Sequence, residues 1–82
     1  MSFYAYVLKN RVSNRLYKGQ CEDLESRIKQ HNGKATKTTR FHAGAWELAY
    51  FEAFETRVEA IAREQYFKTA AGRRFLKDKI QS

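Results

Sequence analysis

Residues 3–21, FYAYVLKNRVSNRLYKGQC, contain two short apolar and aromatic runs separated by a polar segment. The runs, Phe3 to Leu8 and Leu16 to Cys21, are typical of strands, because aromatic and branched side chains fit a pleated surface. The segment between them contains two asparagines and one serine, residues that favour turns. The stretch therefore predicts a β-hairpin.

The residues after the hairpin predict a helix. Asp23 can cap its N-terminus, and Leu24 and Ile28 share its apolar side. Asn32-Gly33 supplies the left-handed stop that commonly ends a helix. Residues 34–44 (KATKTTRFHAG) show no periodicity, so we expect a basic, hydroxyl-rich connection there.

A third strand is expected over residues 46–54, where the side chains alternate. One side carries Trp46, Leu48, Tyr50, Glu52 and Phe54, and the other carries Glu47, Ala49, Phe51 and Ala53. Because both sides include apolar groups, we expect this strand inside a sheet that helices cover on both faces, as in a layered α/β sandwich.

Two more helices are expected after this strand. Residues 56–59 form a capping box, in which Thr56 accepts from the backbone N–H of Glu59 and the Glu59 side chain reaches back to Thr56. This helix is expected to run to about residues 69–70, with a break or turn around Gly72. Apolar spacing predicts a last short helix over residues 73–80. The expected fold class is therefore α/β (α+β), with the order β-β-α-β-α-α.

Length and composition bound the class of protein. With 82 residues, we expect a single domain over residues 1–82. A domain of this size buries only about 60% of its unfolded surface, so it is marginally stable unless a homodimer forms or a ligand binds. A hydrophobic content of 43% and an aromatic content of 15%, without proline, argue against disorder.

Several other classes are excluded. The single Cys21 cannot form an intramolecular disulfide, and no Cys/His cluster has the spacing of a structural zinc site. The sequence has no secretory apolar region and no long apolar run, so no signal peptide or membrane span is expected. We therefore expect a soluble, cytoplasmic protein.

The net charge of +7 is concentrated in the first half of the chain. Residues 1–40 hold nine Lys or Arg against three acidic residues, a net +6, and the rest is close to balanced. This basic footprint fits a polyanionic partner, because each cation that neutralises a phosphate releases counterions. For a small basic domain of arbitrary kind, a solubilising surface charge is an equally good explanation.

Arg27 and His31 lie four residues apart on the first expected helix, so their side chains project from one face. Together they can present a permanent cation and a titratable imidazole to one phosphate. The alternative, which these two residues alone favour, is that Arg27 pairs with Asp23 and that His31 ends the helix.

Glu64 is a carboxylate in an apolar setting, since Ala60, Ile61 and Phe67 are its helical neighbours. An ionised carboxylate there needs a cation, a metal or hydrogen bonds. Mg²⁺ held by one carboxylate, with phosphate oxygens and waters completing its shell, would satisfy this need. An ion pair with Lys68 is the other explanation, and the sequence leaves the two close.

Tyr6 and Tyr17 lie on adjacent strands of the expected hairpin and can lie near one another. A phenol with its ordinary pKa of about 10 is a poor base at neutral pH. Tyr17 would therefore need Arg27, Lys18 or a metal-bound water nearby to act. Packing in the core is the commoner role of tyrosines in strands.

Together these segments resemble the GIY-YIG nuclease superfamily, and the chain looks like a small stand-alone member from Phe3 to about Ile80. Tyr4-Ala5-Tyr6 takes the place of the first signature, and Tyr17-Lys18-Gly19 takes that of the second. Residues 23–32 are similar to the family's first helix, which carries its catalytic Arg. Residues 46–52 are similar to its third strand, and residues 62–68 to the helix that carries its metal-binding Glu.

This resemblance implies a three-stranded antiparallel sheet flanked by helices, and cleavage of a DNA phosphodiester with one divalent ion. It implies that Glu64 holds Mg²⁺ or Mn²⁺ and that Arg27 grips the scissile phosphate. Tyr17 would deprotonate or orient the attacking water, Tyr6 would position it, and His31 would assist. These roles are mutually consistent, because phosphoryl transfer needs charge neutralisation and an aligned nucleophile.

The sequence departs from the family pattern in and beside both signatures. Tyr4 and Ala5 stand where the first signature has glycine and isoleucine, and Cys21 stands where threonine is expected. Lys18 stands where the second signature has an apolar middle residue. Two explanations stay open: Lys18 contacts phosphate, or its presence marks an altered activity. The other two residues of that signature are retained.

The leading hypothesis is a metal-dependent DNA endonuclease. A basic nucleic-acid-binding module without cleavage and an interaction domain with a relic site are the alternatives. Nucleic-acid contacts are expected from Lys18 and, along the sugar-phosphate backbone, from Lys34, Lys37 and Arg40. Without a targeting domain, recognition of a DNA structure, a single strand or a partner protein is expected rather than direct base readout. The sequence does not separate repair, restriction and mobile-element roles, or DNA from RNA.

Overall fold

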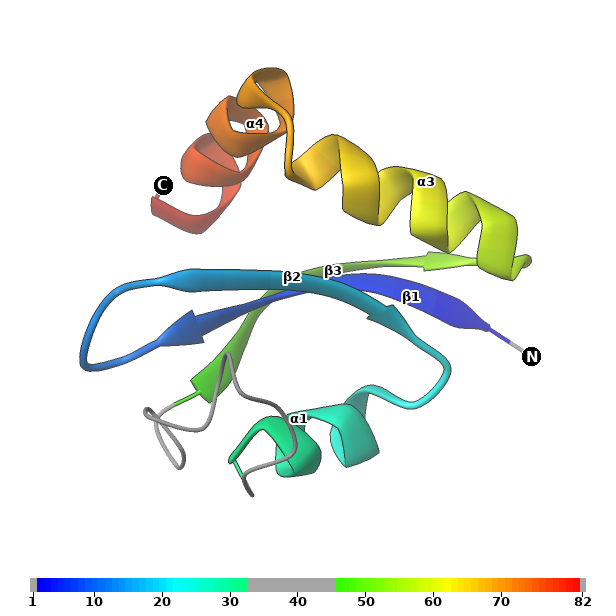
Figure 1. Ribbon diagram of the computed structural model, residues 1–82, viewed down its shortest axis with the longest axis horizontal. Helices are drawn as coiled ribbons and strands as arrows, with labels where there is room; N and C mark the ends of the chain where they lie inside the picture. The colour runs from blue at the N-terminus through cyan, green and yellow to red at the C-terminus, as the bar shows by residue number, and fades with distance from the viewer. Residues whose placement is uncertain (1, 33–45, 82) are drawn as a thin grey trace.

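The computed structural model describes residues 2–32 and 46–81. It contains the strands β1 (Phe3–Asn10), β2 (Leu16–Cys21) and β3 (Trp46–Phe54) and the helices α1 (Leu24–Asn32), α3 (Arg57–Phe67) and α4 (Ala70–Gln81). Figure 1 shows α1 on one face of the sheet and α3 and α4 on the other. The predicted α+β class and the order β-β-α-β-α-α are confirmed. Within the described ranges, no helix is long and apolar enough to cross a membrane.

β1 and β2 form the predicted antiparallel hairpin, in which Tyr6 lies opposite Gly19. The side-chain Oδ1 of Asn10 holds the turn, because it accepts hydrogen bonds from two backbone N–H groups, both at 2.9 Å. Asn14 in the same turn has a φ of 61°, a left-handed conformation that asparagine tolerates. The turn chemistry expected from these asparagines is therefore present.

β1 is the central strand of the sheet, whose order is β2-β1-β3. The prediction of a strand over residues 46–54 is confirmed, but its expected place inside the sheet is wrong. β3 is an edge strand, and Phe51 on it is 47% exposed. Both of its sides carry apolar groups because helices contact both faces of this small sheet even at its edge.

A β-bulge changes the predicted alternation of β3. Between two successive residues of β1 the pairing moves from Tyr50 to Leu48, so Ala49 is an extra residue. Trp46 therefore packs in the cluster on the α1 face, whereas Tyr50 packs against the cluster on the α3 and α4 face. The expectation that Trp46 and Tyr50 share one side is wrong, because one inserted residue reverses the order of faces.

Each face of the sheet has its own apolar cluster. The cluster on the α3 and α4 face consists of the buried residues Ala5, Val7, Phe67 and Leu76, and that on the α1 face of Tyr6, Leu8, Cys21 and Trp46. Successive side chains of β1 alternate between the two clusters, which is why residues 5–8 are all buried. The central strand thus carries residues for both layers.

Both predicted N-terminal caps form. Asp23 accepts a hydrogen bond from the backbone N–H of Ser26 at 3.2 Å, and hydrogen bonds from Ser26 lower the pKa of Asp23. Thr56 accepts from the backbone N–H of Glu59 at 3.3 Å, and the Glu59 carboxylate accepts from the Thr56 hydroxyl at 2.9 Å. The C-terminal stop expected at Gly33 and the connection expected over residues 34–44 lie outside the described residues.

The boundary between α3 and α4 comes earlier than predicted. α3 ends at Phe67 and α4 begins at Ala70, where the Thr69 hydroxyl accepts from the backbone N–H of Gly72 at 3.0 Å. The expected break at Gly72 is therefore wrong, since this residue lies in the first turn of α4. A Cβ at Gly72 would lie 1.9 Å from the carbonyl oxygen of Tyr66, so glycine permits α4 to approach the end of α3.

Candidate active site

Three of the predicted site residues meet on the α1 face of the sheet. The hydroxyl oxygen of Tyr6 on β1 lies 3.1 Å from Nε2 of His31 on α1. The ring of Tyr17 on β2 lies 4.4 Å from the His31 ring and 6.5 Å from the Tyr6 ring, centroid to centroid. The hairpin and α1 therefore bring two phenols and one imidazole into a single cluster, which we call the Tyr6–His31 cluster.

Gly19 makes room for this cluster. It lies opposite Tyr6, and a Cβ at this position would be 2.5 Å from the Tyr6 hydroxyl oxygen. A larger residue would have to displace the phenol from His31, because a packed interior has no space to absorb an extra methyl group. The glycine retained from the second signature thus serves close packing at the site.

Burial sets the ionisation of the cluster. Tyr6 is 2% exposed and His31 is 1% exposed. Burial raises the pKa of Tyr6; the nearby Tyr17 and the Glu64 carboxylate raise it further, and the Arg27 charge opposes them. Burial, followed by the Arg27 charge, lowers the pKa of His31. Near pH 7 the cluster therefore holds a neutral phenol against a neutral imidazole.

Arg27 on α1 lies close enough to shift the pKa of both Tyr6 and His31. Within residues 2–32 and 46–81, no ion pair joins its guanidinium to Asp23 or to any other carboxylate. Asp23 instead accepts hydrogen bonds from Ser26 in the helix cap. The alternative of a surface Arg27–Asp23 pair is therefore not formed, and Arg27 places a positive charge beside the cluster.

Glu64 is on α3, which covers the opposite face of the sheet from α1 (Figure 1). Its carboxylate accepts a hydrogen bond from Nζ of Lys68 at 3.2 Å, and its side chain is 17% exposed. The ion pair considered from the sequence is thus formed. Glu64 still acts on the cluster through its charge, since it raises the pKa of Tyr6. Tyr6, Tyr17 and His31 touch one another, whereas Arg27 and Glu64 act on them electrostatically.

The single carboxylate of Glu64 suits a hard divalent ion that keeps several waters, and not an ion enclosed by protein ligands alone. Within the described part of the chain, no three His, Cys, Asp or Glu side chains gather as ligands. Mg²⁺ commonly binds one or two carboxylates and completes its shell with waters and substrate phosphates, so a lone carboxylate is compatible with it. Cys21 is a poor ligand, because burial raises the pKa of its thiol and keeps it protonated.

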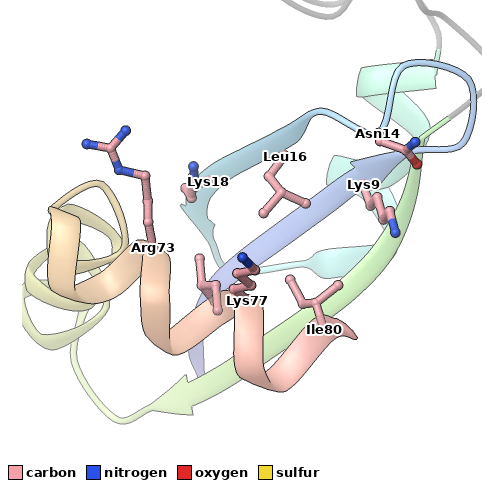
Figure 2. Close-up of a pocket in the computed structure, with 8 residues that line it drawn as sticks. Lys9, Asn14, Leu16, Lys18, Arg73, Lys77 and Ile80 are labelled. Atoms are coloured by element: carbon pink, nitrogen blue, oxygen red, sulfur yellow. The ribbon is translucent and has the colours of Figure 1, made fainter. Parts of the chain in front are cut away.

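Lys18 lies on the opposite face of β2 from Tyr17, because successive strand residues alternate. Figure 2 shows it on the α4 side of the sheet, at a pocket whose lining includes Arg73 and Lys77. The structure therefore does not bring Lys18 to the Tyr6–His31 cluster, and its charge does not disturb that cluster. The other expected nucleic-acid contacts, Lys34, Lys37 and Arg40, lie outside the described residues.

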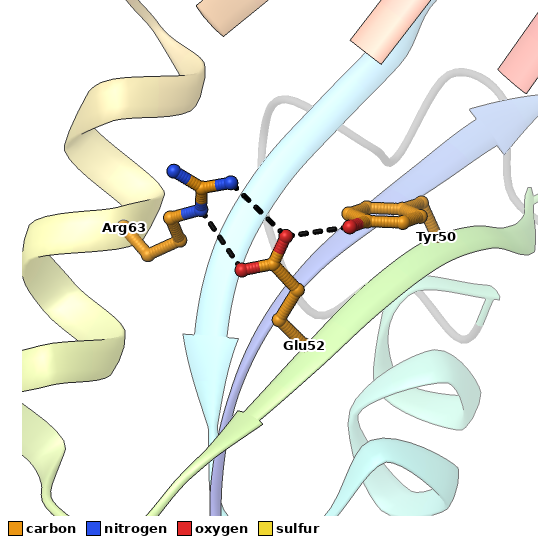
Figure 3. A network of polar contacts seen from close by, with 3 residues as sticks. All are labelled: Tyr50, Glu52 and Arg63. Carbon is orange, nitrogen blue, oxygen red and sulfur yellow. Dashed lines mark hydrogen bonds and ion pairs between the residues drawn. The ribbon is translucent and has the colours of Figure 1, made fainter. Parts of the chain in front are cut away.

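A polar network on the α3 and α4 face was missed from the sequence (Figure 3). The Glu52 carboxylate accepts from the Tyr50 hydroxyl at 2.5 Å and from Nε of Arg63 at 2.9 Å. Burial opposes ionisation of Glu52, but hydrogen bonds from Arg63 and Tyr50 outweigh it and lower the pKa of Glu52. Burial and the hydrogen bond to Glu52 raise the pKa of Tyr50 to about 12. The polar groups of this network pair with one another, so we regard the network as structural. Its signal in the sequence was the placement of Tyr50 and Glu52 on one side of the strand.

A family model described as the GIY-YIG catalytic domain matches residues 2–77. The chain belongs to the GIY-YIG family. A UPF0213 protein of Clostridium perfringens is 47% identical over 66 residues, which cover 79% of this chain and 69% of that protein. A UPF0213 protein of Staphylococcus saprophyticus is 37% identical over 75 residues, which cover 90% and 89% respectively. The solution structure of a UPF0213 protein from Bacillus halodurans matches with a TM-score of 0.56 and 31% identity, covering 95% of this chain and 84% of that one.

Membership of the GIY-YIG family indicates a nuclease-type function, although the names of these relatives state no activity. The two departures in the first GIY-YIG signature are accommodated by packing. The rings of Tyr4 and Phe51 pack in a T-shaped arrangement with their centroids 5.8 Å apart. Ala5 is fully buried in the cluster that contains Phe67. Neither departure removes a residue of the Tyr6–His31 cluster.

Proposed function

We propose that the protein is a divalent-metal-dependent endonuclease that hydrolyses DNA phosphodiester bonds. The observation that supports this most is the contact of Tyr6, Tyr17 and His31 beside the Arg27 charge. Phosphodiester hydrolysis needs a cation for the developing negative charge and groups that orient a water molecule. Arg27 supplies the cation, and the Tyr6–His31 cluster beside it supplies groups that can orient water.

Arg27 is the proposed phosphate ligand. Its guanidinium is permanently charged, and within the described residues no carboxylate neutralises it. A planar guanidinium can donate two parallel hydrogen bonds to phosphate oxygens. Arg27 therefore stabilises the negative charge that builds up on the phosphate during hydrolysis.

Tyr6 and His31 are proposed to hold and orient the water. The raised pKa of Tyr6 keeps its phenol protonated, so it acts as a hydrogen-bond donor and not as a base. His31 fixes the orientation of that phenol through the 3.1 Å contact. In the tautomer with a protonated Nε2, His31 donates to the phenol oxygen, and the O–H of Tyr6 can donate to the water. Tyr17, which is less buried than Tyr6, is the group that deprotonates or orients the attacking water.

Glu64 would hold Mg²⁺ or Mn²⁺ together with water and substrate phosphate oxygens. When bound, such an ion neutralises phosphate charge and makes a coordinated water more acidic. Lys68 donates to the same carboxylate in the structure. Pairs of this i,i+4 kind on helices contribute about 0.3–0.5 kcal/mol, so Lys68 offers little resistance to a competing cation.

Glu64→Gln tests this function. The variant keeps the shape of the side chain but loses the charge, so we expect Mg²⁺- or Mn²⁺-dependent cleavage of plasmid and single-stranded DNA to be abolished. DNA binding in EDTA and the circular dichroism spectrum should stay close to those of the parent. Lys68→Gln is the matched control, because it removes the same ion pair and leaves the carboxylate; it should cut within about threefold of the parent rate. Metal-dependent cleavage by Glu64→Gln would overturn the proposal.

The second candidate is a nucleic-acid-binding module that does not cleave. The pairing of Glu64 with Lys68 favours it, because the metal-binding carboxylate already has a cation. Parent protein that binds DNA but leaves it intact in both Mg²⁺ and Mn²⁺ would establish this alternative. An interaction domain with a relic site loses its main support, since Lys18 lies on the other face of the sheet from Tyr17.

A further inference from the structure

A basic cavity lies on the face of the sheet opposite the Tyr6–His31 cluster. It has a volume of about 460 Å³ and is lined by the β1–β2 hairpin and α4 (Figure 2). Its polar lining includes Lys9, Lys18, Arg73 and Lys77, and none of its described lining residues is a carboxylate. A volume of this size is typical of small-molecule sites, which span about 300–1,000 Å³.

In the part of the chain that the structure describes, the four cations of this cavity face no counter-charge. Within residues 2–32 and 46–81, none of them forms an ion pair with a carboxylate. Burial lowers the pKa of Lys18, and the charges of Arg73 and Lys68 lower it further. Cations held close together without an anion repel one another, so a bound anion would be stabilised by all of them.

The floor of the cavity is apolar. Leu16 and Ile80 line it while partly exposed, and they pack over Leu76, which is fully buried beneath them. Asn14 adds an amide, which can both donate and accept hydrogen bonds. An inorganic anion would leave this floor in contact with water, and a hydrocarbon would leave the cations unpaired. A ligand that matches the whole surface is therefore anionic at one end and apolar, with a polar edge, at the other.

We propose that this cavity binds a nucleoside phosphate. The phosphate lies on the lysine and arginine side chains, the base and sugar lie on the apolar floor, and Asn14 meets the edge of the base. A free mononucleotide and the terminal nucleotide of a strand share this chemistry. The site is separate from the Tyr6–His31 cluster, and it does not rest on the proposed cleavage activity.

The test is a titration of the full chain with adenosine monophosphate in EDTA, followed by amide NMR. EDTA removes divalent ions, so the result is independent of cleavage. We expect shifts concentrated at residues 16–18 and 73–80, and a loss of affinity of about tenfold or more in Arg73→Gln/Lys77→Gln. Arg74→Gln is the matched control, because Arg74 is the exposed neighbour of Arg73 and does not line the cavity. It should change the affinity by less than about twofold.

A second titration identifies the source of the nucleotide. A 5′-phosphorylated oligonucleotide that binds more tightly than its 5′-hydroxyl counterpart, and that adenosine monophosphate displaces, identifies a strand terminus. Binding of the mononucleotide with no preference between the two oligonucleotides identifies a free ligand. The proposal is overturned if inorganic phosphate binds as tightly as adenosine monophosphate, if Arg74→Gln weakens binding as much as the double variant, or if no shifts occur at the cavity.

Discussion

Tyr6 and Tyr17 differ in what surrounds their hydroxyl groups. Tyr6 is 2% exposed, and its hydroxyl lies against His31. Tyr17 is partly exposed, and its ring lies 4.4 Å from the His31 ring, centroid to centroid, at an interplanar angle of 59°. Because water and DNA can reach Tyr17 more easily, it is the phenol to which the proposed proton transfer or water orientation is assigned.

Tyr17→Phe separates chemistry from packing at this position. The variant keeps the aromatic area, so a structural tyrosine should lose about one hydrogen bond, or about 1 kcal/mol. If the phenol acts on the water, the cleavage rate should fall about 10²- to 10⁴-fold with little change in Tm. Tyr66→Phe on α3, away from the cluster, is the matched control. A Tyr17→Phe variant that cuts at the parent rate would place Tyr17 in the core alone.

The buried imidazole of His31 predicts a pH dependence of stability. Its pKa is lowered in the folded protein, so between the ordinary value of about 6.5 and the lowered value only the unfolded chain binds the proton. The free energy of unfolding should therefore fall as the pH drops below about 6.5, at up to about 1.4 kcal/mol per pH unit. Urea titrations of the parent and His31→Gln from pH 5 to pH 8 test this. The variant should show a flatter profile, and identical slopes would contradict the assignment.

The main residues of the candidate site could be predicted because each depends on local signals. A hairpin and the helix after it place Tyr6, Tyr17 and His31 on one face. Strand alternation also places Lys18 on the other face. The cavity around Lys18 could not be predicted, because it exists only where α4 docks against the hairpin. Docking of that kind leaves no periodic signal in either segment.

At the scale of elements, the junction of α3 and α4 depends on close backbone approach. Gly72 has good access to helical conformations, yet glycine is a poor helix former, so the sequence suggested a break there. In the structure Gly72 is helical, and glycine is needed there because a side chain would collide with the carbonyl oxygen of Tyr66. The bulge at Ala49 could not be predicted, because the side chains before and after it alternate without interruption in the sequence.

Gly72→Ala tests the packing at this junction. Helix propensity alone would favour alanine by about 1 kcal/mol. The contact of 1.9 Å with backbone instead requires α4 to move, so we expect a net loss of at least about 2 kcal/mol and a Tm lower by about 10 °C. Ala71→Gly at the exposed neighbouring position is the control and should cost at most about 1 kcal/mol. A Gly72→Ala variant more stable than the parent would show that α4 does not approach α3 so closely.

Across the whole molecule, the sheet separates two surfaces of different chemistry. The α1 face carries the Tyr6–His31 cluster and Arg27, and the opposite face carries the basic cavity between the hairpin and α4. The central strand serves both, since its side chains alternate between the layers. A change in the Tyr6–His31 cluster therefore need not disturb the cavity. Glu64 is on α3, and its partner Lys68 acts on Lys18 through its charge, so the two proposed sites are best separated by changes in the cluster and at Arg73 and Lys77.

The charge of the first half of the chain predicts how DNA binding responds to salt. Residues 1–40 carry a net +6, and three of their cations, Lys34, Lys37 and Arg40, are proposed backbone contacts. Replacing all three with Gln should weaken binding on every sequence and flatten the slope of log K against log salt by about 0.9 per lost contact on duplex DNA. Binding measured by fluorescence anisotropy at several salt concentrations gives this slope.

The slope is informative because it counts phosphate contacts without requiring a structure of the complex. Arg74→Gln, a charge change outside the proposed contacts, should weaken binding little and leave the slope close to that of the parent. If the triple variant also keeps the parent slope, the DNA backbone does not follow residues 34–40. The phosphate contacts would then have to come from elsewhere, with Arg27 beside the Tyr6–His31 cluster as the first residue to replace.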